Sequence, residues 1–257
     1  MIKVFVGCAP NHDDAESQAV LEYSLRRHTS HDVDITWMKL TDDPSSPFYA
    51  PDWDTGQWPT PFSGFRYAVP ALCDFEGRAI YMDSDVIVLA DIAELFNADM
   101  NGKAVMAKNQ GRLCVSLWDC EHSSARLSLA DARRGVRPSL AVQPFPDGAN
   151  WNCLDGEHYA SLTDPEIKAL HYTSMPHQPH LLRAIPRLAV AGLRHWFDGK
   201  PTAHWRPDVD ALFDANYFAA TAAGYTVDRY CQDPPLGAYR KGSVASLRGA
   251  VPSWGRK

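Results

Sequence analysis

The chain has 257 residues, 45% hydrophobic and 22% charged, which excludes general disorder and leaves room for one large domain or two small ones. Its formal net charge of -6 disfavours a nucleic-acid partner held mainly by phosphate contacts. The six cysteines form no CxxC pair, unlike a zinc site or a small disulfide scaffold, so we interpret them as reduced core thiols.

The N-terminal residues predict a βα unit. Residues 2–6 are a β-rich run that ends at Gly7, and Asp13 with Glu16 matches a capping box that opens a helix. Residues 33–37 then alternate between apolar and polar side chains, as a second strand does. The start of the chain lacks the pattern of a signal peptide, and no apolar run approaches the ~20 residues of a membrane-spanning helix. We therefore expect a soluble, cytoplasmic protein.

The middle of the chain predicts buried strands. Residues 41–60 are rich in Pro, Asp, Ser and Gly and predict a long surface loop. Ser63 is placed to cap a helical segment, in which Pro70 either makes a kink or marks where the helix begins. Residues 79–82 and 86–89 are continuous apolar runs, the pattern of strands that are buried on both faces.

The remaining elements complete one α/β domain. Asp91 and Glu94 resemble a second capping box. Further strands are predicted at residues 105–107, 113–118 and 167–172, helices at 123–134 and around 209–220, and a loop at 138–156. Strands that alternate with helices favour a mostly parallel central sheet flanked by helices on both faces. We assign this domain to residues 1–228 and a basic tail, with six Lys or Arg against one Asp, to residues 229–257.

The acidic turn Asp83-Ser84-Asp85 is the most informative motif. In extended backbone, residues i and i+2 point to the same side, so both carboxylates can face one cation, and ligands bind at the carboxyl ends of parallel strands. A solvated turn is the alternative, although the apolar runs on either side oppose it. His171 ends another predicted strand and is a candidate third ligand. The loop that it opens carries His177, His180 and two prolines.

These residues together resemble the metal-dependent GT-A glycosyltransferases of glycosyltransferase family 8 and their bacterial relatives. The resemblance covers roughly residues 1–182. It rests on the initial Val-Phe-Val-Gly strand, on Phe65-Arg66-Tyr67 with Pro70, on Tyr81 through Val86, and on the loop from His171 to Pro179. It implies a single GT-A (Rossmann-like) domain and transfer of a sugar from a nucleotide-sugar donor, with retention of anomeric configuration.

The resemblance also implies residue roles. Asp83, Asp85 and His171 would bind a divalent cation, for which Mn²⁺ suits a site with an imidazole better than Mg²⁺. The donor, with a UDP-sugar as first choice, would be bound by Gly7, Cys8, Ala9, Arg66, Asp83, Ser84 and His177. The acceptor would be a carbohydrate, a lipid or a protein.

The chain also departs from the family pattern. His177 stands where members usually have a Lys that contacts the pyrophosphate, and His180 stands where close bacterial relatives often have Trp. The usual Asp-Gln pair on the sugar side is missing, although Trp151-Asn152 follows as expected. Asp131 is the nearest acidic residue upstream and is the catalytic candidate. For Asp131, and also for Asp155 and Glu157, the alternative is a residue that only forms an ion pair at the surface.

Three further hypotheses stay open. An AspXAsp motif after an apolar strand also occurs in haloacid-dehalogenase-like phosphohydrolases, although their motif normally has Thr where this chain has Ile87. The departures also fit an inactive nucleotide- and metal-binding protein of the same fold. Finally, the basic tail is either a solvated extension or a peripheral contact with the inner face of a membrane.

Overall fold

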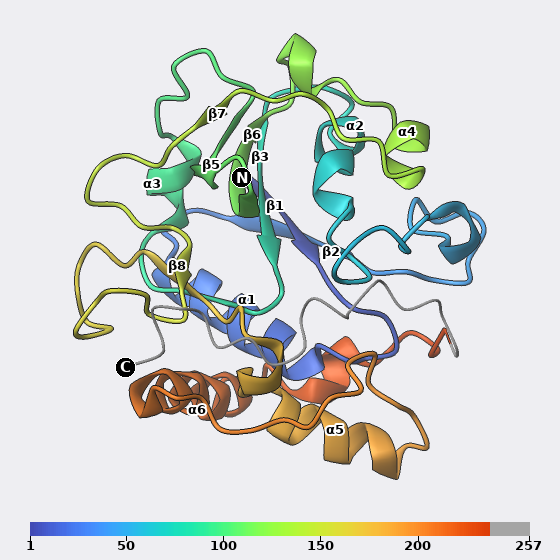
Figure 1. Cartoon of the computed structure of the whole chain (residues 1–257), viewed down its shortest axis with the longest axis vertical. Helices are drawn as coiled ribbons and strands as arrows, with labels where there is room; N and C mark the ends of the chain where they lie inside the picture. The colour runs from blue at the N-terminus through green and yellow to red at the C-terminus, as the bar shows by residue number, and fades with distance from the viewer. Residues whose placement is uncertain (237–257) are drawn as a thin grey trace.

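A six-stranded sheet forms the centre of the protein (Figure 1). The structure, a computed structural model, describes residues 1–236. The strand order is β2-β1-β3-β6-β5-β7. The strands are β1 (Ile2–Gly7), β2 (Val33–Met38), β3 (Arg78–Asp83), β5 (Val105–Asn109), β6 (Arg112–Asp119) and β7 (Val142–Gln143).

The predicted α/β architecture is confirmed, and the sheet is mixed in direction. β1 pairs in parallel with β2 and with β3, and β5 pairs in parallel with β7. β6 runs antiparallel to both β3 and β5. The reason is the short connection at residues 110–111, since strands that are joined by two residues can only form an antiparallel hairpin.

A second, three-stranded sheet has the order β4-β9-β8. Its strands are β4 (Val86–Val88), β9 (Ala169–His171) and β8 (Cys153–Leu154). Because β3 ends at Asp83 and β4 begins at Val86, the chain passes from one sheet to the other through the acidic turn. The turn therefore lies at the junction of the two sheets.

Helices cover both faces of the central sheet, as predicted. In β1, Val4 and Val6 pack in the core beneath α1 (Ala15–His28), whereas Phe5 points to the opposite face, which α2 (Val69–Leu72) covers. This is the two-residue alternation of a strand with two buried faces. Figure 1 shows α5 (Leu181–Val190) and α6 (Pro207–Ala222) on the α1 side. The remaining helices are α3 (Ile92–Phe96), α4 (Leu129–Arg133) and the 3₁₀ turns η1 (Ala50–Asp52), η2 (Phe65–Ala68), η3 (Ser123–Ala125), η4 (Met175–His177) and η5 (Val227–Tyr230).

Several helix predictions are refined. The helix predicted at residues 123–134 is interrupted and becomes η3 and α4, because Ser128 caps a new helix by accepting the Asp131 amide proton. Pro70 lies in the first turn of α2, after the 3₁₀ turn η2, so it marks where the helix begins. Asp91 caps α3 as predicted, through a hydrogen bond from the Ala93 amide.

The capping box predicted at Asp13 and Glu16 is wrong. The N-cap of α1 is Asp14, and its side chain makes no capping bond. Asp13 instead accepts the Trp196 amide proton at 3.0 Å, and Glu16 forms an ion pair with Arg187 on α5 at 2.7 Å. Both acids therefore tie α1 to segments that are distant in sequence.

The boundary proposed at residue 228 falls inside η5. Tyr230 is buried against α1, where its hydroxyl donates to Glu22 at 3.0 Å, so the first residues assigned to the tail pack against the domain. Residues 237–257, which carry most of the predicted basic charge, lie outside the described part of the chain. None of the helices found in residues 1–236 is long and apolar enough to cross a membrane.

Candidate functional site

A cavity of about 370 Å³ opens at the junction of the two sheets, above the end of β3. It lies at the carboxyl edge of the parallel strands β1 and β3, where open α/β sheets bind ligands. The residues that line it come from seven parts of the chain: Asp14; Trp58, Pro59, Thr60, Phe62, Ser63, Arg66 and Tyr67; Asp83, Ser84 and Asp85; Gln110, Gly111, Arg112, Leu113 and Cys114; Arg137; His171, Thr173, Met175, Gln178 and His180; and Trp196.

The predicted cation ligands Asp83, Asp85 and His171 meet in this cavity. Strand β9 pairs with β4 in a register that places His171 opposite Val86, one residue after Asp85. The imidazole Nε2 of His171 lies 3.1 Å from Asp85 Oδ1 and 4.0 Å from Asp83 Oδ2. Each aspartate therefore places a carboxylate oxygen within 4.0 Å of His171 Nε2.

The chemistry of these atoms fits a divalent cation. Asp85 Oδ1 is buried and receives no hydrogen bond, which leaves its lone pairs without a donor. Nδ1 of His171 lies 2.9 Å from Asn152 Oδ1, and only a protonated Nδ1 can donate to this amide oxygen, so Nε2 is free to bind a cation in the neutral ring. Burial opposes protonation of His171, but the carboxylates of Asp85 and Asp83 outweigh it and raise its pKa.

Cys114 also lies near Asp83 and His171, within 4.8 Å between ligand atoms. Burial raises the pKa of its thiol to about 12, so the sulfur stays protonated at neutral pH. Arg66 Nη1 donates to the Cys114 sulfur at 3.6 Å. Thiolate ligands suit softer cations than Mn²⁺ or Mg²⁺, so we count Cys114 as a neighbour of Arg66 and not as a ligand of the cation.

Arg66 balances the charge of Asp83, as part of a buried group. Its Nη2 lies 3.2 Å from Asp83 Oδ1, its guanidinium lies 5.2 Å from the ring centre of Tyr81, and the Tyr81 hydroxyl donates to Asp83 at 2.7 Å. Burial opposes the guanidinium charge, but Asp83 outweighs it and raises the pKa of Arg66 well above its usual value. The predicted donor-binding Arg66 lines the cavity, and Asp83 holds it there.

Replacing Asn152 with alanine is expected to weaken Mn²⁺ binding about 10- to 100-fold, because the Asn152 amide fixes the tautomer and the orientation of His171. Isothermal titration with Mn²⁺ measures this change. Asn152→Asp supplies a matched control, since a carboxylate also accepts the Nδ1 proton and should retain most of the affinity. Equal loss in both variants would contradict the positioning role.

The loop after His171 presents Gln178 to the cavity in place of the predicted His177. The Gln178 amide donates to Asp85 Oδ2 and to the Tyr172 carbonyl, both at 2.6 Å. His177 does not line the cavity, because its ring bonds to Ser174 Oγ and packs against Trp205. The donor-binding prediction for His177 is therefore not supported, and the next residue takes the position facing the acids.

The first strand contributes backbone and packing. The Gly7 carbonyl accepts the Ser84 amide proton at 3.1 Å, and a Cβ on Gly7 would lie only 2.2 Å from the Tyr81 hydroxyl. Gly7 is thus required by Tyr81, which in turn binds Asp83. Cys8 and Ala9 are fully buried, and none of these three predicted donor-binding residues lines the cavity, whereas Ser84 does.

The other acidic candidates have structural partners. Asp131 does not line the cavity; it lies on α4, where it accepts from Ser128 and forms a surface ion pair with Arg134. Asp155 is buried and accepts the Thr173 amide proton at 3.0 Å, which fixes the loop after His171. Glu157 forms an ion pair with Lys108. For all three residues, these contacts support a structural role and not a catalytic one. Asp155 differs from the prediction in that it is buried, whereas a surface position was expected.

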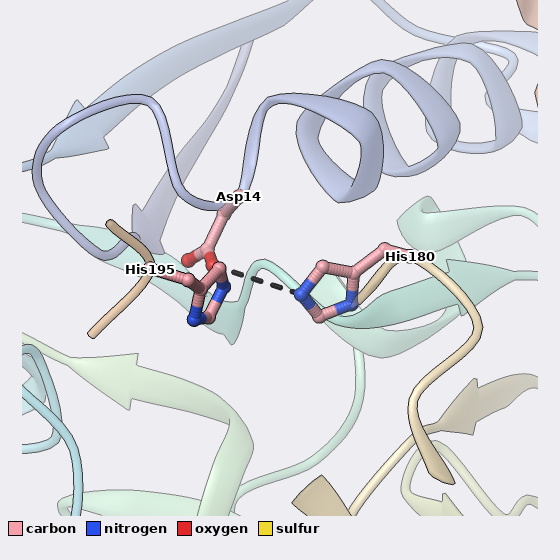
Figure 2. Close-up of side chains that lie close together, drawn as sticks. All are labelled: Asp14, His180 and His195. Atoms are coloured by element: carbon pink, nitrogen blue, oxygen red, sulfur yellow. Dashed lines mark ion pairs between the residues drawn. The ribbon is translucent and has the colours of Figure 1, made fainter. Parts of the chain in front are cut away.

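Asp14 is a cavity residue that the sequence did not reveal. It faces His180 and His195 (Figure 2), with 4.0 Å between its Oδ1 and His180 Nε2. Although these three side chains are close enough to hold a metal, the Phe197 amide donates to His195 Nδ1, which leaves the ring proton on Nε2. An N–H is no metal ligand, so we do not count the group as a metal site; Asp14 and His195 instead accept hydrogen bonds from Ala9, Ser84 and Phe197.

Asp14 is expected to make stability depend on pH. Burial raises its pKa to about 7, against hydrogen bonds from the Ala9 amide and the Ser84 hydroxyl that favour the ionised form. The unfolded value is about 3.9, so between about pH 4 and pH 7 the folded protein holds a proton that the unfolded chain has released. Raising the pH through this window should therefore lower the free energy of unfolding by on the order of 3 kcal/mol.

Asp14→Asn cannot ionise and should lack this loss. Urea denaturation of the wild type and of the variant at several pH values between 4 and 7.5 measures the difference. The same pH dependence in both proteins would show that Asp14 does not carry the effect.

Comparisons with known proteins agree with this geometry. A model of the family described as Glycosyl transferase family 8 matches residues 61–134, which include Arg66 and the acidic turn. Protein CDI of Arabidopsis thaliana is 34% identical over 208 residues, covering 66% of this chain and 77% of that protein.

Two solved structures share the fold. The galactosyltransferase LgtC, in complex with donor and acceptor sugar analogs, is 11% identical with a TM-score of 0.51, over 87% of this chain and 96% of that one. The bifunctional glycosyltransferase WbbM is 14% identical with the same TM-score, over 86% of this chain and 49% of that one. The present chain thus spans about half the length of WbbM.

Proposed function

Because this chain belongs to glycosyl transferase family 8 and is a glycosyltransferase, we propose that it transfers a sugar from a nucleotide-sugar donor in the cavity at the end of β3, with the help of a divalent cation. One observation carries the proposal. His171 Nε2 lies within 4.0 Å of an oxygen of Asp83 and an oxygen of Asp85 beside Arg66, and Asp85 Oδ1 accepts no hydrogen bond from the residues that the structure describes.

Mn²⁺ is the cation that we propose, with Mg²⁺ as the alternative, because two carboxylates and one imidazole suit a later transition metal. When bound, it would neutralise the charge that develops on the departing nucleoside diphosphate. Hydrogen bonds and an ion pair within the protein orient the three ligand side chains. Gln178 fixes Asp85, Asn152 fixes His171, and Tyr81 with Arg66 fixes Asp83.

The finer assignments rest on family membership. A UDP-sugar is our first choice of donor, retention is our choice of stereochemistry, and the acceptor is a carbohydrate, a lipid or a protein. LgtC, which shares the fold, binds donor and acceptor sugar analogs. A cytoplasmic location, with the basic tail at the inner face of the membrane, is a further proposal. Its test is whether truncation after Leu236, which leaves η5 and the buried Tyr230 in place, weakens binding to anionic vesicles.

Release of nucleoside diphosphate from a panel of nucleotide sugars tests the proposed reaction. The panel contains UDP-, GDP-, ADP-, CDP- and dTDP-sugars, each with Mn²⁺, with Mg²⁺ and with EDTA. We expect cation-dependent release from one nucleotide class, and loss of the activity in EDTA. Release of inorganic phosphate from simple phosphate esters would instead support a phosphohydrolase. Binding of nucleotide and cation without turnover of any donor would support an inactive member of the fold.

A further inference from the structure

Two arginines at the cavity have no acidic partner among the residues that the structure describes. Arg112 and Arg137 both line the cavity and are exposed at its opening. Neither forms an ion pair with any carboxylate side chain of residues 1–236, and residues 237–257 contain no Asp or Glu. Most other arginines in this region are neutralised, as Arg66 is by Asp83 and Arg133 by Asp52. Arg112 and Arg137 therefore give the cavity opening a local excess of positive charge, in a chain of net charge -6.

Arg112 lies in the cavity wall near Cys114. Val115 of β6 pairs with Met82 of β3, so Cys114 lies beside Asp83, and the Cys114 sulfur contacts Arg66. Arg112 is two residues before Cys114 in β6, and both residues line the cavity.

Arg137 is held in place by an aromatic ring. Its guanidinium lies 4.2 Å from the ring centre of Trp58, a distance typical of a cation–π contact. Trp58 is itself fixed, because it packs on Gly64 so closely that a Cβ there would lie 2.6 Å from the indole nitrogen. A guanidinium that stacks through its face keeps the N–H groups of its edge available, and these suit the oxygens of a carboxylate or a phosphate.

We propose that Arg112 and Arg137 form a subsite for an oxyanion, either a carboxylate or a phosphate, that is carried by the acceptor or by the transferred sugar. This inference rests on the proposed function and names the substrate class of the same cavity. The donor diphosphate does not explain the pair. In the proposed function, a cation held by Asp83, Asp85 and His171 would bind the diphosphate, whereas the two arginines come from the β5–β6 hairpin and the segment after α4.

Paired neutral and charged sugars test the subsite. Titrations use the full chain saturated with Mn²⁺ and UDP, and compare galactose with galacturonate and with galactose 1-phosphate. A second set, with Mn²⁺ alone, compares UDP-glucose with UDP-glucuronate. We expect the charged member of one set to bind at least about tenfold more tightly, since hydrogen bonds to charged groups are the strong ones. A preference in the first set places the oxyanion on the acceptor, and one in the second set places it on the transferred sugar.

The variants Arg112→Gln and Arg137→Gln should each reduce the preference to less than about threefold while UDP affinity in Mn²⁺ stays unchanged. Arg137→Lys keeps the positive charge but loses the planar guanidinium edge. Its preference for the charged sugar should lie between that of the glutamine variants and that of the wild type. Arg126→Gln is the control, because this exposed arginine packs on Phe75 away from the cavity. Equal affinity for charged and neutral sugars, or a preference that survives both glutamine variants, would overturn the proposal.

Loss of UDP affinity in the glutamine variants would also overturn it, since the arginines would then bind the donor diphosphate. If UDP does not bind the wild type with Mn²⁺, the proposed function fails. The free sugars alone then decide the subsite by the same comparison of variants.

Discussion

Asp85→Asn is expected to lower cation-dependent turnover about 100- to 1000-fold while leaving the protein folded. The substitution keeps the shape of the side chain, and its carbonyl oxygen can still accept the Gln178 hydrogen bond. It removes the negative charge that faces His171 at 3.1 Å and that the cation needs. Release of nucleoside diphosphate measures turnover, and titration with Mn²⁺ measures the expected loss of affinity.

Asp147→Asn is the matched control, because Asp147 is exposed in the loop before β8 and lies outside the cavity. It should retain wild-type turnover and Mn²⁺ affinity. Circular dichroism of both variants shows whether the fold is kept. If Asp85→Asn turned over donor at the wild-type rate, Asp85 could not be a ligand of a cation that the reaction requires.

Arg66→Ala is expected to lower the free energy of unfolding by about 3 kcal/mol in the absence of metal. The arginine and Asp83 are both about nine-tenths buried, so removal of the guanidinium leaves a carboxylate without its counter-charge. Mn²⁺ should restore more stability to this variant than to the wild type, because a bound cation supplies the missing positive charge. Urea denaturation with and without Mn²⁺ measures both effects.

Arg134→Ala provides the comparison. Arg134 also forms an ion pair, with Asp131, but its side chain is 67% exposed, so the loss should stay below about 1 kcal/mol. Similar losses in the two variants would show that the Arg66–Asp83 pair has no special role in the stability of the cavity.

The local patterns of the sequence were sufficient for most strands and for the acidic turn, whereas the short strands β7 and β8 lie in residues 138–156, where a loop was predicted. Residues 79–82 and 86–89 are apolar because β3 and β4 are buried on both faces, and only Asp83-Ser84-Asp85 interrupts them. A charged turn between two buried strands has few explanations besides a ligand site. His171 could be predicted for a similar reason, as the polar end of a buried strand.

The sequence could not show the role of a side chain where contacts with residues distant in sequence determine that role. The box at Asp13 and Glu16 matches a local capping rule, yet both acids bind partners more than 150 residues away. In the loop after His171, the 3₁₀ turn η4 determines that Gln178 and not the adjacent His177 faces the cavity. No clear sequence pattern predicts this turn. Asp14, Arg112 and Arg137 reach the cavity only through the topology of the sheet.

Helix α5 illustrates a second limit. It begins at Leu181 without a side-chain cap and contains Pro186, so propensity alone argues against it. Arg187 holds it to Glu16 of α1 through two hydrogen bonds, and Leu181, Ala184 and Leu188 are buried. Tertiary packing therefore stabilises a helix that local rules do not predict.

Anomalous diffraction at the manganese edge, from crystals grown with Mn²⁺ and UDP, tests the central claim most directly. We predict one strong peak within about 2.5 Å of an Asp83 oxygen, an Asp85 oxygen and His171 Nε2, with the UDP diphosphate beside it. A peak among Asp14, His180 and His195, or no ordered manganese in the cavity while UDP is bound, would contradict the assignment of the cation site to the acidic turn.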